Sequence, residues 1–377
     1  MTVASPDFRA SRCTRYRYRY STCTRCTDAC PHEAVTLSDE GAALDPARCQ
    51  NCALCISACR TGAWTSGSFK PIDLLRQAIK RPAWRVACAP SGESADAIVP
   101  CLGAIDGVTL AYLAKRRIPT TLHGSWQCTA CSHGASGAAQ LRLNLEALDV
   151  LHEAATKSAG AGVATDWLMP IIGEDPRAAG TQHNKADSAA FTPARRQLFR
   201  RLIGRGVDEV VRAATLGGEP AAVAEKAIRA GSYALTEQRE LLQIVCKQKE
   251  DRPFEARLHA ALPLMQLTLK AGCTLCEACF RVCPTGALQI EENPGDWALT
   301  FQIDRCVACE ACLEVCQPRV LDAAAVFDAR SEQPARVLLS LNKQRCARCD
   351  RYFVSPSPEK TCPVCCDDED AFSAIFG

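Results

Sequence analysis

The residues most able to do chemistry in this sequence are its cysteines. The chain of 377 residues contains 26 of them, against 6 histidines and 3 methionines. Three stretches repeat the full spacing C-x2-C-x2-C-x3-C, and most other cysteines occur as C-x2-C pairs. The three stretches are Cys49, Cys52, Cys55 and Cys59; Cys273, Cys276, Cys279 and Cys283; and Cys306, Cys309, Cys312 and Cys316. Thiolates at this spacing can surround an iron–sulfur cluster, so the predicted chemistry is metal ligation and one-electron transfer.

This spacing resembles that of bacterial ferredoxins that carry two [4Fe–4S] clusters. In such modules the fourth cysteine of each run ligates the cluster of the other run. The resemblance implies two modules in this chain. In the second module the expected ligand sets are Cys273, Cys276, Cys279 with Cys316, and Cys306, Cys309, Cys312 with Cys283. In the first module one expected set is Cys49, Cys52, Cys55 with Cys30.

The other run of the first module is irregular. Cys23 and Cys26 keep the spacing, but Tyr20 occupies the position of the first ligand. We expect the chain between Cys13 and Cys23 to loop out and to return a ligand to the same cluster. The expected set is Cys13, Cys23, Cys26 and Cys59. If Cys13 does not reach, the site would hold a [3Fe–4S] cluster.

Residues 73–152 form a segment of another kind. Short strand-like runs at 84–88, 97–101 and 119–123 alternate with helical patterns, which predicts a small parallel sheet. Four cysteines fall at or just past the ends of these strands, where open α/β sheets bind ligands. They are Cys88, Cys101, Cys128 and Cys131. A [2Fe–2S] cluster suits them, and a structural zinc ion or free, redox-active thiols are the alternatives.

The same segment resembles the iron–sulfur delta subunit of methyl-viologen-reducing hydrogenases. The resemblance rests on PCLGAID at residues 100–106 and CTACSHG at residues 128–134. It implies one [2Fe–2S] cluster and a relay of electrons between hydrogenase and heterodisulfide reductase. The cysteine spacing C-x12-C-x26-C-x2-C is also similar to that of thioredoxin-like ferredoxins, which have three residues within the last pair.

The C-terminal cysteines predict a metal-stabilised ribbon. Two C-x2-C pairs separated by twelve residues are typical of a zinc ribbon or a rubredoxin. We expect structural zinc, because the segment is too short to hold a core of its own, with a one-iron site as the alternative. The expected ligands are Cys346, Cys349, Cys362 and Cys365. Cys366 competes with Cys365, which the spacing favours, and Cys246 is predicted to be a buried apolar residue.

Together these signals predict an α+β, multidomain chain. The expected parts are a ferredoxin-like module at 1–72, an α/β domain at 73–152, a linker with helices at 153–235, a second module at 236–330 and a zinc-ribbon-like domain at 331–377. In the linker, Thr192-Pro193 and Pro220 are typical helix starts.

The bulk properties exclude several function classes. The net charge of +2 gives no global case for nucleic acid, and no apolar run is long enough for a signal peptide or a spanning helix. We therefore expect a cytoplasmic protein with reduced thiols. Arginine and tyrosine alternate over residues 15–20, which we interpret as a short exposed strand, with protein docking or nucleic-acid contact as alternatives.

No glycine-rich nucleotide motif and no catalytic constellation stands beside the cysteines, so no nucleotide cofactor is expected. The whole resembles polyferredoxin-type subunits found with formate or aldehyde oxidoreductases, hydrogenases and heterodisulfide reductases. We expect a non-catalytic electron-transfer subunit whose partners are a catalytic oxidoreductase subunit and an acceptor such as a membrane or quinone-linked subunit. Two alternatives stay open: an enzyme that uses the Cys88, Cys101, Cys128 and Cys131 site for substrate chemistry, and an iron–sulfur redox sensor.

Overall fold

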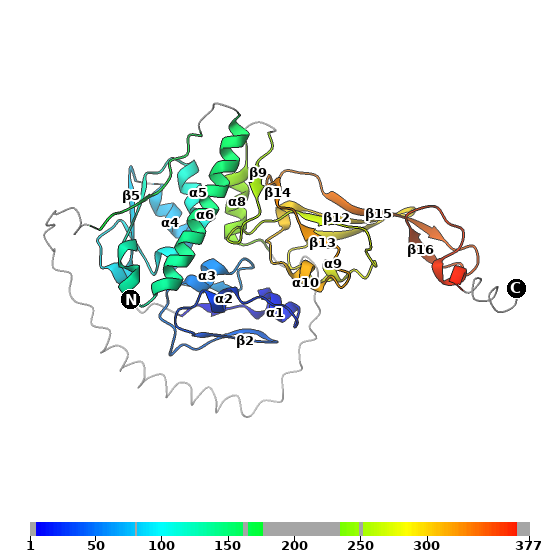
Figure 1. The fold of residues 1–377 in the computed structure, drawn as a ribbon, viewed down its shortest axis with the longest axis horizontal. Coiled ribbons are helices and arrows are strands. Elements are labelled where there is room, and N and C mark those ends of the chain that lie inside the picture. The colour runs from blue at the N-terminus through cyan, green and yellow to red at the C-terminus, as the bar shows by residue number, and fades with distance from the viewer. Residues whose placement is uncertain (1–4, 80, 161–164, 176–233, 249–251, 368–377) are drawn as a thin grey trace, which may run out of the picture. The chain divides into compact units, whose positions relative to one another are not determined.

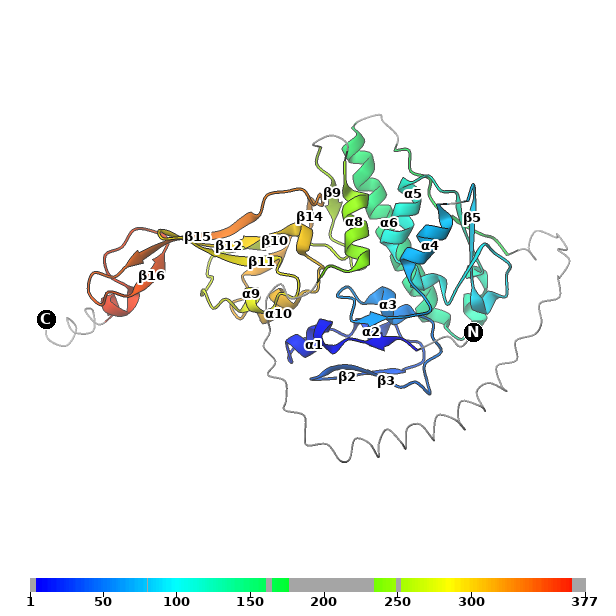
Figure 2. The same ribbon diagram turned by 180° about the vertical axis from the view of Figure 1, so that it is seen from behind.

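The computed structural model, drawn in Figures 1 and 2, describes residues 5–79, 81–160, 165–175, 234–248 and 252–367. Nearly all of these residues belong to one unit that comprises residues 1–173 and 228–377. The helices predicted to begin at Thr192 and Pro220 lie outside the described residues.

The first module consists of ligand loops around two small antiparallel pairs of strands. Strand β1 (Asp7–Phe8) pairs with β4 (Trp64–Thr65), and β2 (Val35–Ser38) pairs with β3 (Gly41–Leu44). The pair β2–β3 is a short antiparallel hairpin between the two cysteine runs. The helices are short: α1 (Thr14–Arg17), α2 (Arg25–Asp28) and α3 (Leu54–Ala58).

The arginine–tyrosine segment differs from its prediction. We predicted an exposed strand, but residues 14–17 form helix α1 and the side chain of Arg17 is buried. Only the end of the segment reaches the surface, where Tyr20 is 69% exposed. The prediction of an exposed strand is wrong because Arg17 makes a hydrogen bond to the second module, which alternation of residue types alone cannot reveal.

The central domain contains a four-stranded parallel sheet in the order β6-β5-β7-β8. Its strands are β5 (Trp84–Cys88), β6 (Ala97–Val99), β7 (Thr120–His123) and β8 (Ile171–Ile172). The predicted parallel sheet is confirmed, and β8 adds a strand within the region expected as linker. Helices α4 (Pro71–Ala78) and α5 (Gly107–Lys115) lie beside the sheet, and α5 packs against the long helix α6 (Gly134–Ala159).

Helix α6 extends further towards the C-terminus than the sequence suggests. It ends at Ala159, so residues 153–159 belong to this helix and not to the linker expected to begin at residue 153. Small residues near its start permit a close approach to the rest of the domain, since a Cβ atom at Gly137 would lie 3.0 Å from Cys101 Sγ. Near its end, Ala154 and Ala155 are buried in the core, which keeps the last turns helical.

The second module begins with helix α8 (Glu237–Cys246), whose N-terminus is capped by the Thr236 side chain. Cys246 is fully buried, as predicted. Two strand pairs follow: β9 (Glu255–Arg257) with β14 (Val326–Asp328), and β10 (Leu267–Leu269) with β13 (Leu321–Ala323). Helices α9 (Ala278–Val282) and α10 (Ala311–Val315) each end one residue before a fourth ligand cysteine.

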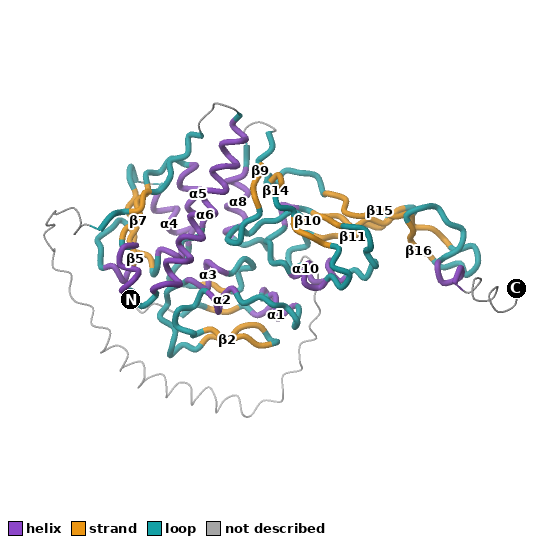
Figure 3. The backbone as a smooth tube through the Cα atoms, in the orientation of Figure 1, coloured by secondary structure: helices purple, strands orange, loops and turns teal. Residues whose placement is uncertain are grey.

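A single sheet joins the second module to the C-terminal ribbon. Strands β11 (Leu288–Glu292), β12 (Asp296–Phe301), β15 (Arg336–Arg345) and β16 (Tyr352–Ser355) form it in this order, all antiparallel. Figure 3 shows β15 extending from β12 towards β16. The sheet therefore continues past residue 331, where the sequence suggests that a separate domain begins.

Candidate metal centres

The three regular cysteine runs share one backbone signature. In each run two residues have positive φ: the second residue after the first cysteine, and the residue directly after the second cysteine. These residues are Asn51 and Ala53, Leu275 and Glu277, and Ala308 and Glu310, with φ between 50° and 66°. None of them is glycine, and side chains rarely adopt this conformation. The repetition shows that all three loops curl in the same way, which turns their cysteine side chains inward.

The loops that carry the fourth cysteines repeat a second signature. The third residue after each of these cysteines has positive φ, namely Glu33, Gly62, Gly286 and Arg319. In the first module the next residue donates its backbone N–H to the cysteine sulfur, from Ala34 to Cys30 and from Ala63 to Cys59, both at 3.3 Å. The irregular run thus keeps the regular geometry around its last cysteine.

Cys13 occupies the local structure of a first ligand. A 3₁₀ turn, Ala10–Arg12, precedes it, as the turn Ile303–Arg305 precedes Cys306. Burial raises the pKa of the Cys13 thiol, and the neighbouring thiols of Cys59 and Cys23 raise it further. The structure therefore brings Cys13 to its predicted partners, although Tyr20 stands at the expected position in the sequence.

The other predicted ligand sets are also gathered. Burial, followed by the nearby thiols of Cys30 and Cys49, raises the pKa of Cys52 to about 11. In the second module, burial and the thiols of Cys273, Cys276 and Cys316 raise the pKa of Cys279 to about 11. Burial and the thiols of Cys283 and Cys306 raise the pKa of Cys309 to about 12. Each fourth cysteine lies with the opposite run, as in the crossed arrangement of two-cluster modules.

A family model for the 4Fe-4S dicluster domain matches the chain twice. The matches cover residues 21–63 and 272–320. The two modules are therefore 4Fe-4S dicluster domains of an iron–sulfur electron-transfer protein. Cys13 lies outside the first match, so its role rests on the geometry above. No curated protein and no solved structure matches the chain.

Across the described part of the chain, no helix is both long enough and apolar enough to cross a membrane.

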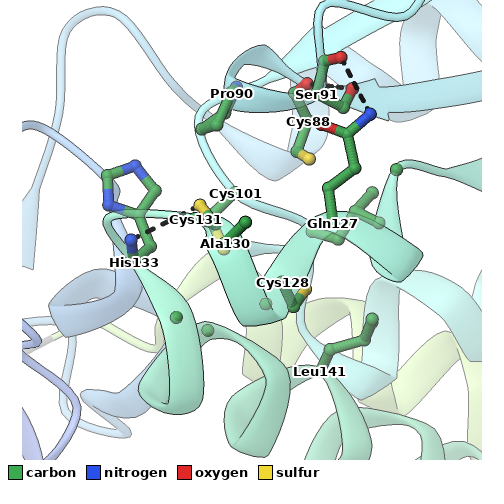
Figure 4. Close-up of a pocket in the computed structure, with 15 residues that line it drawn as sticks. Cys88, Pro90, Ser91, Cys101, Gln127, Cys128, Ala130, Cys131, His133 and Leu141 are labelled. Carbon is green, nitrogen blue, oxygen red and sulfur yellow. Dashed lines mark hydrogen bonds between the residues drawn. The ribbon is translucent and has the colours of Figure 1, made fainter.

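The four central cysteines line one cavity of about 70 Å³ at the C-terminal edge of the parallel sheet. Cys88 ends β5, Cys101 follows β6, and Cys128 and Cys131 lie in and after the 3₁₀ helix Ser125–Ala130. Figure 4 shows their sulfur atoms around a common space. Gly124, with φ of 98°, lets the chain turn here, because a Cβ atom would lie 3.0 Å from Cys88 Sγ and 2.5 Å from Ser91 Cβ.

The spacing of the central thiols favours a cluster over a single metal ion. Thiolates on a tetrahedral zinc ion lie about 3.8 Å apart, given Zn–S bonds of about 2.3 Å. Within the described residues, only two groups of three or more ligand atoms lie within 4.8 Å of one another, and the central four thiols are not among them.

Two histidines connect the central site to the first module. His32 Nε2 lies 3.0 Å from His133 Nδ1, and both rings are close to the Cys52 sulfur. Each histidine stands two residues after a predicted ligand, Cys30 or Cys131, and the backbone N–H of His133 donates to Cys131 Sγ at 3.4 Å. Burial lowers the pKa of both imidazoles, which keeps the rings neutral and able to pack together.

The ribbon cysteines have the geometry of a mononuclear site. All four predicted ligands, Cys346, Cys349, Cys362 and Cys365, lie within 4.8 Å of one another. Cys349 Sγ and Cys362 Sγ are 3.8 Å apart, the separation expected on a tetrahedral ion. Hydrogen bonds from the backbone N–H groups of Cys349 and Cys362 lower the pKa of the Cys346 thiol to about 6, which favours the thiolate. Cys366 lies outside this group, and its sulfur contacts Thr361 Oγ1 at 3.1 Å.

The sequence analysis missed the arginines that join the modules. Arg60 directly follows Cys59, whereas proline follows two of the other fourth cysteines, Cys30 and Cys283, and Gln317 follows Cys316. Its buried guanidinium donates to the carbonyl oxygens of Ala308 and Ala260 in the second module. The replacement of proline was the available signal. His32 and His133 carried no comparable signal, since their pairing depends on how the domains pack.

Proposed function

We propose that this protein is an electron-relay subunit in which five iron–sulfur sites form one continuous series. The observation that carries the proposal is the order in which the ligand sets contact one another. The order runs from the central site, through the Cys30 set and the Cys13 set of the first module, to the Cys283 set and the Cys316 set of the second. When bound, such clusters accept and release single electrons.

Each step of this series is supported by a contact. Cys101 and Cys52 belong to one apolar cluster, and the charge of Cys52 raises the pKa of Cys101 beyond the effect of burial. Within the first module, the charge of Cys26 likewise adds to the effect of burial in raising the pKa of Cys55. Within the second module, the charge of Cys279 likewise raises the pKa of Cys312. No ligand set is isolated from the series.

The step between the modules passes through Arg60. Its backbone continues from Cys59, and its Nη1 donates to the carbonyl oxygen of Ala308, between Cys306 and Cys309, at 2.6 Å. A covalent path joined by one short hydrogen bond therefore links a ligand of one module to the ligand loop of the other. Thr22 adds a second connection, since its hydroxyl donates to Glu314 at 2.6 Å.

Partner proteins would exchange electrons at the two ends of the series. Cys276 is exposed at one end, and Cys128 and Cys131 are half-buried at the other. We infer that a catalytic oxidoreductase subunit docks at one end and an acceptor, such as a membrane or quinone-linked subunit, at the other. In this proposal the central site holds a [2Fe–2S] cluster and the ribbon holds structural zinc.

Metal analysis of anaerobically purified protein tests the proposal. The four cubanes and the central cluster predict roughly eighteen irons and about one zinc per chain. Neighbouring reduced clusters also predict EPR spectra broadened by spin coupling when the protein is fully reduced. An iron content near that of one cubane, or uncoupled spectra at full iron content, would exclude a continuous relay. Anaerobic co-purification then identifies the oxidoreductase at its end.

A further inference from the structure

The buried arginines of the described chain all meet at one ligand set. Arg17, Arg60 and Arg239 are 6%, 6% and 0% exposed, and no other arginine in this part of the chain is buried. They come from three separate segments, α1, the loop after Cys59, and α8. Each donates to a backbone carbonyl beside the cysteines predicted to hold the Cys283 cluster, whose ligands are Cys283, Cys306, Cys309 and Cys312.

The contacts surround the two ligand loops. Arg239 Nε donates to the carbonyl oxygen of Cys306 and its Nη2 to that of Ile303, both at 2.7 Å. Arg60 Nη1 donates to Ala308 O at 2.6 Å. From the side of Cys283, Arg17 Nε donates to Val282 O at 3.3 Å. All three guanidinium groups are therefore adjacent to ligand residues or in contact with them.

Buried positive charge of this kind needs compensation. Arg60 and Arg239 are 6% and 0% exposed, so both guanidinium charges are removed from water, which is costly. Within the described residues Arg239 donates to no carboxylate and its Nη1 has no hydrogen-bond partner, although the carboxylate of Asp304 lies near enough to favour its charge. Glu310 pairs with Arg60 at 3.0 Å, but it is 45% exposed and shares its carboxylate with Arg25.

We propose that Arg17, Arg60 and Arg239 set the reduction potential of the Cys283 cluster and make it the most readily reduced of the four cubanes. This inference rests on the proposed relay. Four thiolates give a cubane net negative charge, and reduction by a one-electron donor adds one further electron without a proton. Nearby fixed cations, poorly screened in the protein interior, stabilise the reduced state more than the oxidised state.

The position of this cluster gives the tuning a function. The Cys283 cluster lies within the series, between the Cys13 cluster of the first module and the Cys316 cluster of the second. A high potential there would collect electrons that enter from either end. The electron would reside on the Cys283 cluster, beside the buried arginines. The exposed Cys276 marks the end of the series at which the electron is exchanged.

Redox titration of the full, cluster-loaded chain, followed by EPR, tests the proposal. In Arg239→Gln and in Arg60→Gln we expect the highest midpoint potential among the cubanes to fall by at least about 59 mV. This shift corresponds to a tenfold change in the equilibrium constant for one-electron reduction. In Arg239→Gln the other midpoints should stay unchanged, whereas Arg60→Gln should also lower the midpoint of the Cys13 cluster, because Arg60 directly follows its ligand Cys59. Arg239→Lys keeps the charge and should retain most of the potential. Arg281→Gln is the matched control, because Arg281 lies on α9 between Cys279 and Cys283 but is 67% exposed and hence screened by water.

A variant that should raise the highest midpoint potential, instead of lowering it, covers the case in which the arginine variants fail to fold. Glu310→Gln removes the carboxylate beside Arg60 at a half-exposed position, so the highest midpoint should rise. Full iron content with an unmoved highest midpoint in Arg239→Gln and Arg60→Gln would overturn the proposal and leave the relay intact. If those two variants lose iron, an unmoved midpoint in Glu310→Gln overturns it. A low iron content of the unmodified protein would instead overturn the relay itself.

Discussion

The imidazole rings of His32 and His133 pack edge to face, with Nε2 of the first 3.0 Å from Nδ1 of the second and an angle of 80° between the ring planes. His32 belongs to the first dicluster module, and His133 caps the start of α6 in the central domain. The pair is one of the contacts that hold the first module against the central thiol site. The strength of this contact can be measured.

We expect His32→Ala and His133→Ala to have non-additive effects, because each variant removes the same ring contact. Pairs of aromatic rings contribute about 1 kcal/mol beyond the area they bury. Hydrogen exchange of the first turns of α6, measured in both single variants and the double variant, gives the coupling energy directly. Strictly additive losses of protection would show that the two rings do not support each other.

Cys13→Ala tests the displaced ligand of the first module. Loss of one ligand should release one iron and leave a [3Fe–4S] cluster, with an EPR signal near g = 2 in the oxidised protein and roughly one iron fewer per chain. Cys366→Ala is the control, because this cysteine lies outside the group of four ribbon thiols. The iron and zinc content of the Cys366→Ala protein should stay unchanged. Unchanged iron content in Cys13→Ala would remove Cys13 from the ligand set.

Gly137→Ala tests the close approach of α6 to the central thiols. Alanine favours a helix over glycine by about 1 kcal/mol, yet its Cβ would lie 3.0 Å from Cys101 Sγ. We expect the crowding at Cys101 to lower the iron bound at the central site while the cubane signals persist. Gly67→Ala provides a matched control, since no atom lies within 4 Å of the added Cβ. Full iron content in Gly137→Ala would mean that the site tolerates the methyl group.

The buried thiol of Cys246 should make the free energy of unfolding depend on pH. Burial raises the pKa of its thiol from about 9 to about 12, so the folded state holds the proton more tightly than the unfolded state does. The stabilisation is therefore complete below pH 9 and is lost as the pH rises from 9 to 12, by up to about 1.4 kcal/mol per pH unit. Melting temperatures from pH 7 to 10 should fall less steeply in Cys246→Ala, which we expect to cost about 1 kcal/mol at pH 7. Parallel curves for the two proteins would contradict the assignment.

Which cysteines gather together could be predicted from the sequence better than the way the modules are joined. Cysteine spacing reflects the reach of a short loop around a metal centre, so the runs near Cys49, Cys273 and Cys306 could be recognised without a structure. Strand β5 was predicted with its observed bounds, because four of its five residues are apolar and buried and only Arg85 is exposed. These features depend on neighbours along the chain.

Features that depend on distant neighbours were missed. Arg17 looked like one of several exposed arginines, and its burial depends on Val282, which is 265 residues away. Arg239 lies within an amphipathic helix, but a charged side chain on α8 becomes fully buried only because it can donate to Cys306 and Ile303. The close approach of the small residues at the start of α6 to Cys101 was not predicted, because such packing leaves no trace in the periodicity of the sequence.

Strand β15 has a consequence for the protein when metal is withheld. On one side it pairs with β12, and on the other side its last residues pair only with the short strand β16, which lies between the two cysteine pairs of the ribbon. Loss of the metal would release β16 and leave unpaired N–H and C=O groups along the end of a ten-residue strand. Such an edge invites pairing with another chain, so under the proposal that the ribbon holds zinc, removal of zinc should cause aggregation before the iron–sulfur modules unfold.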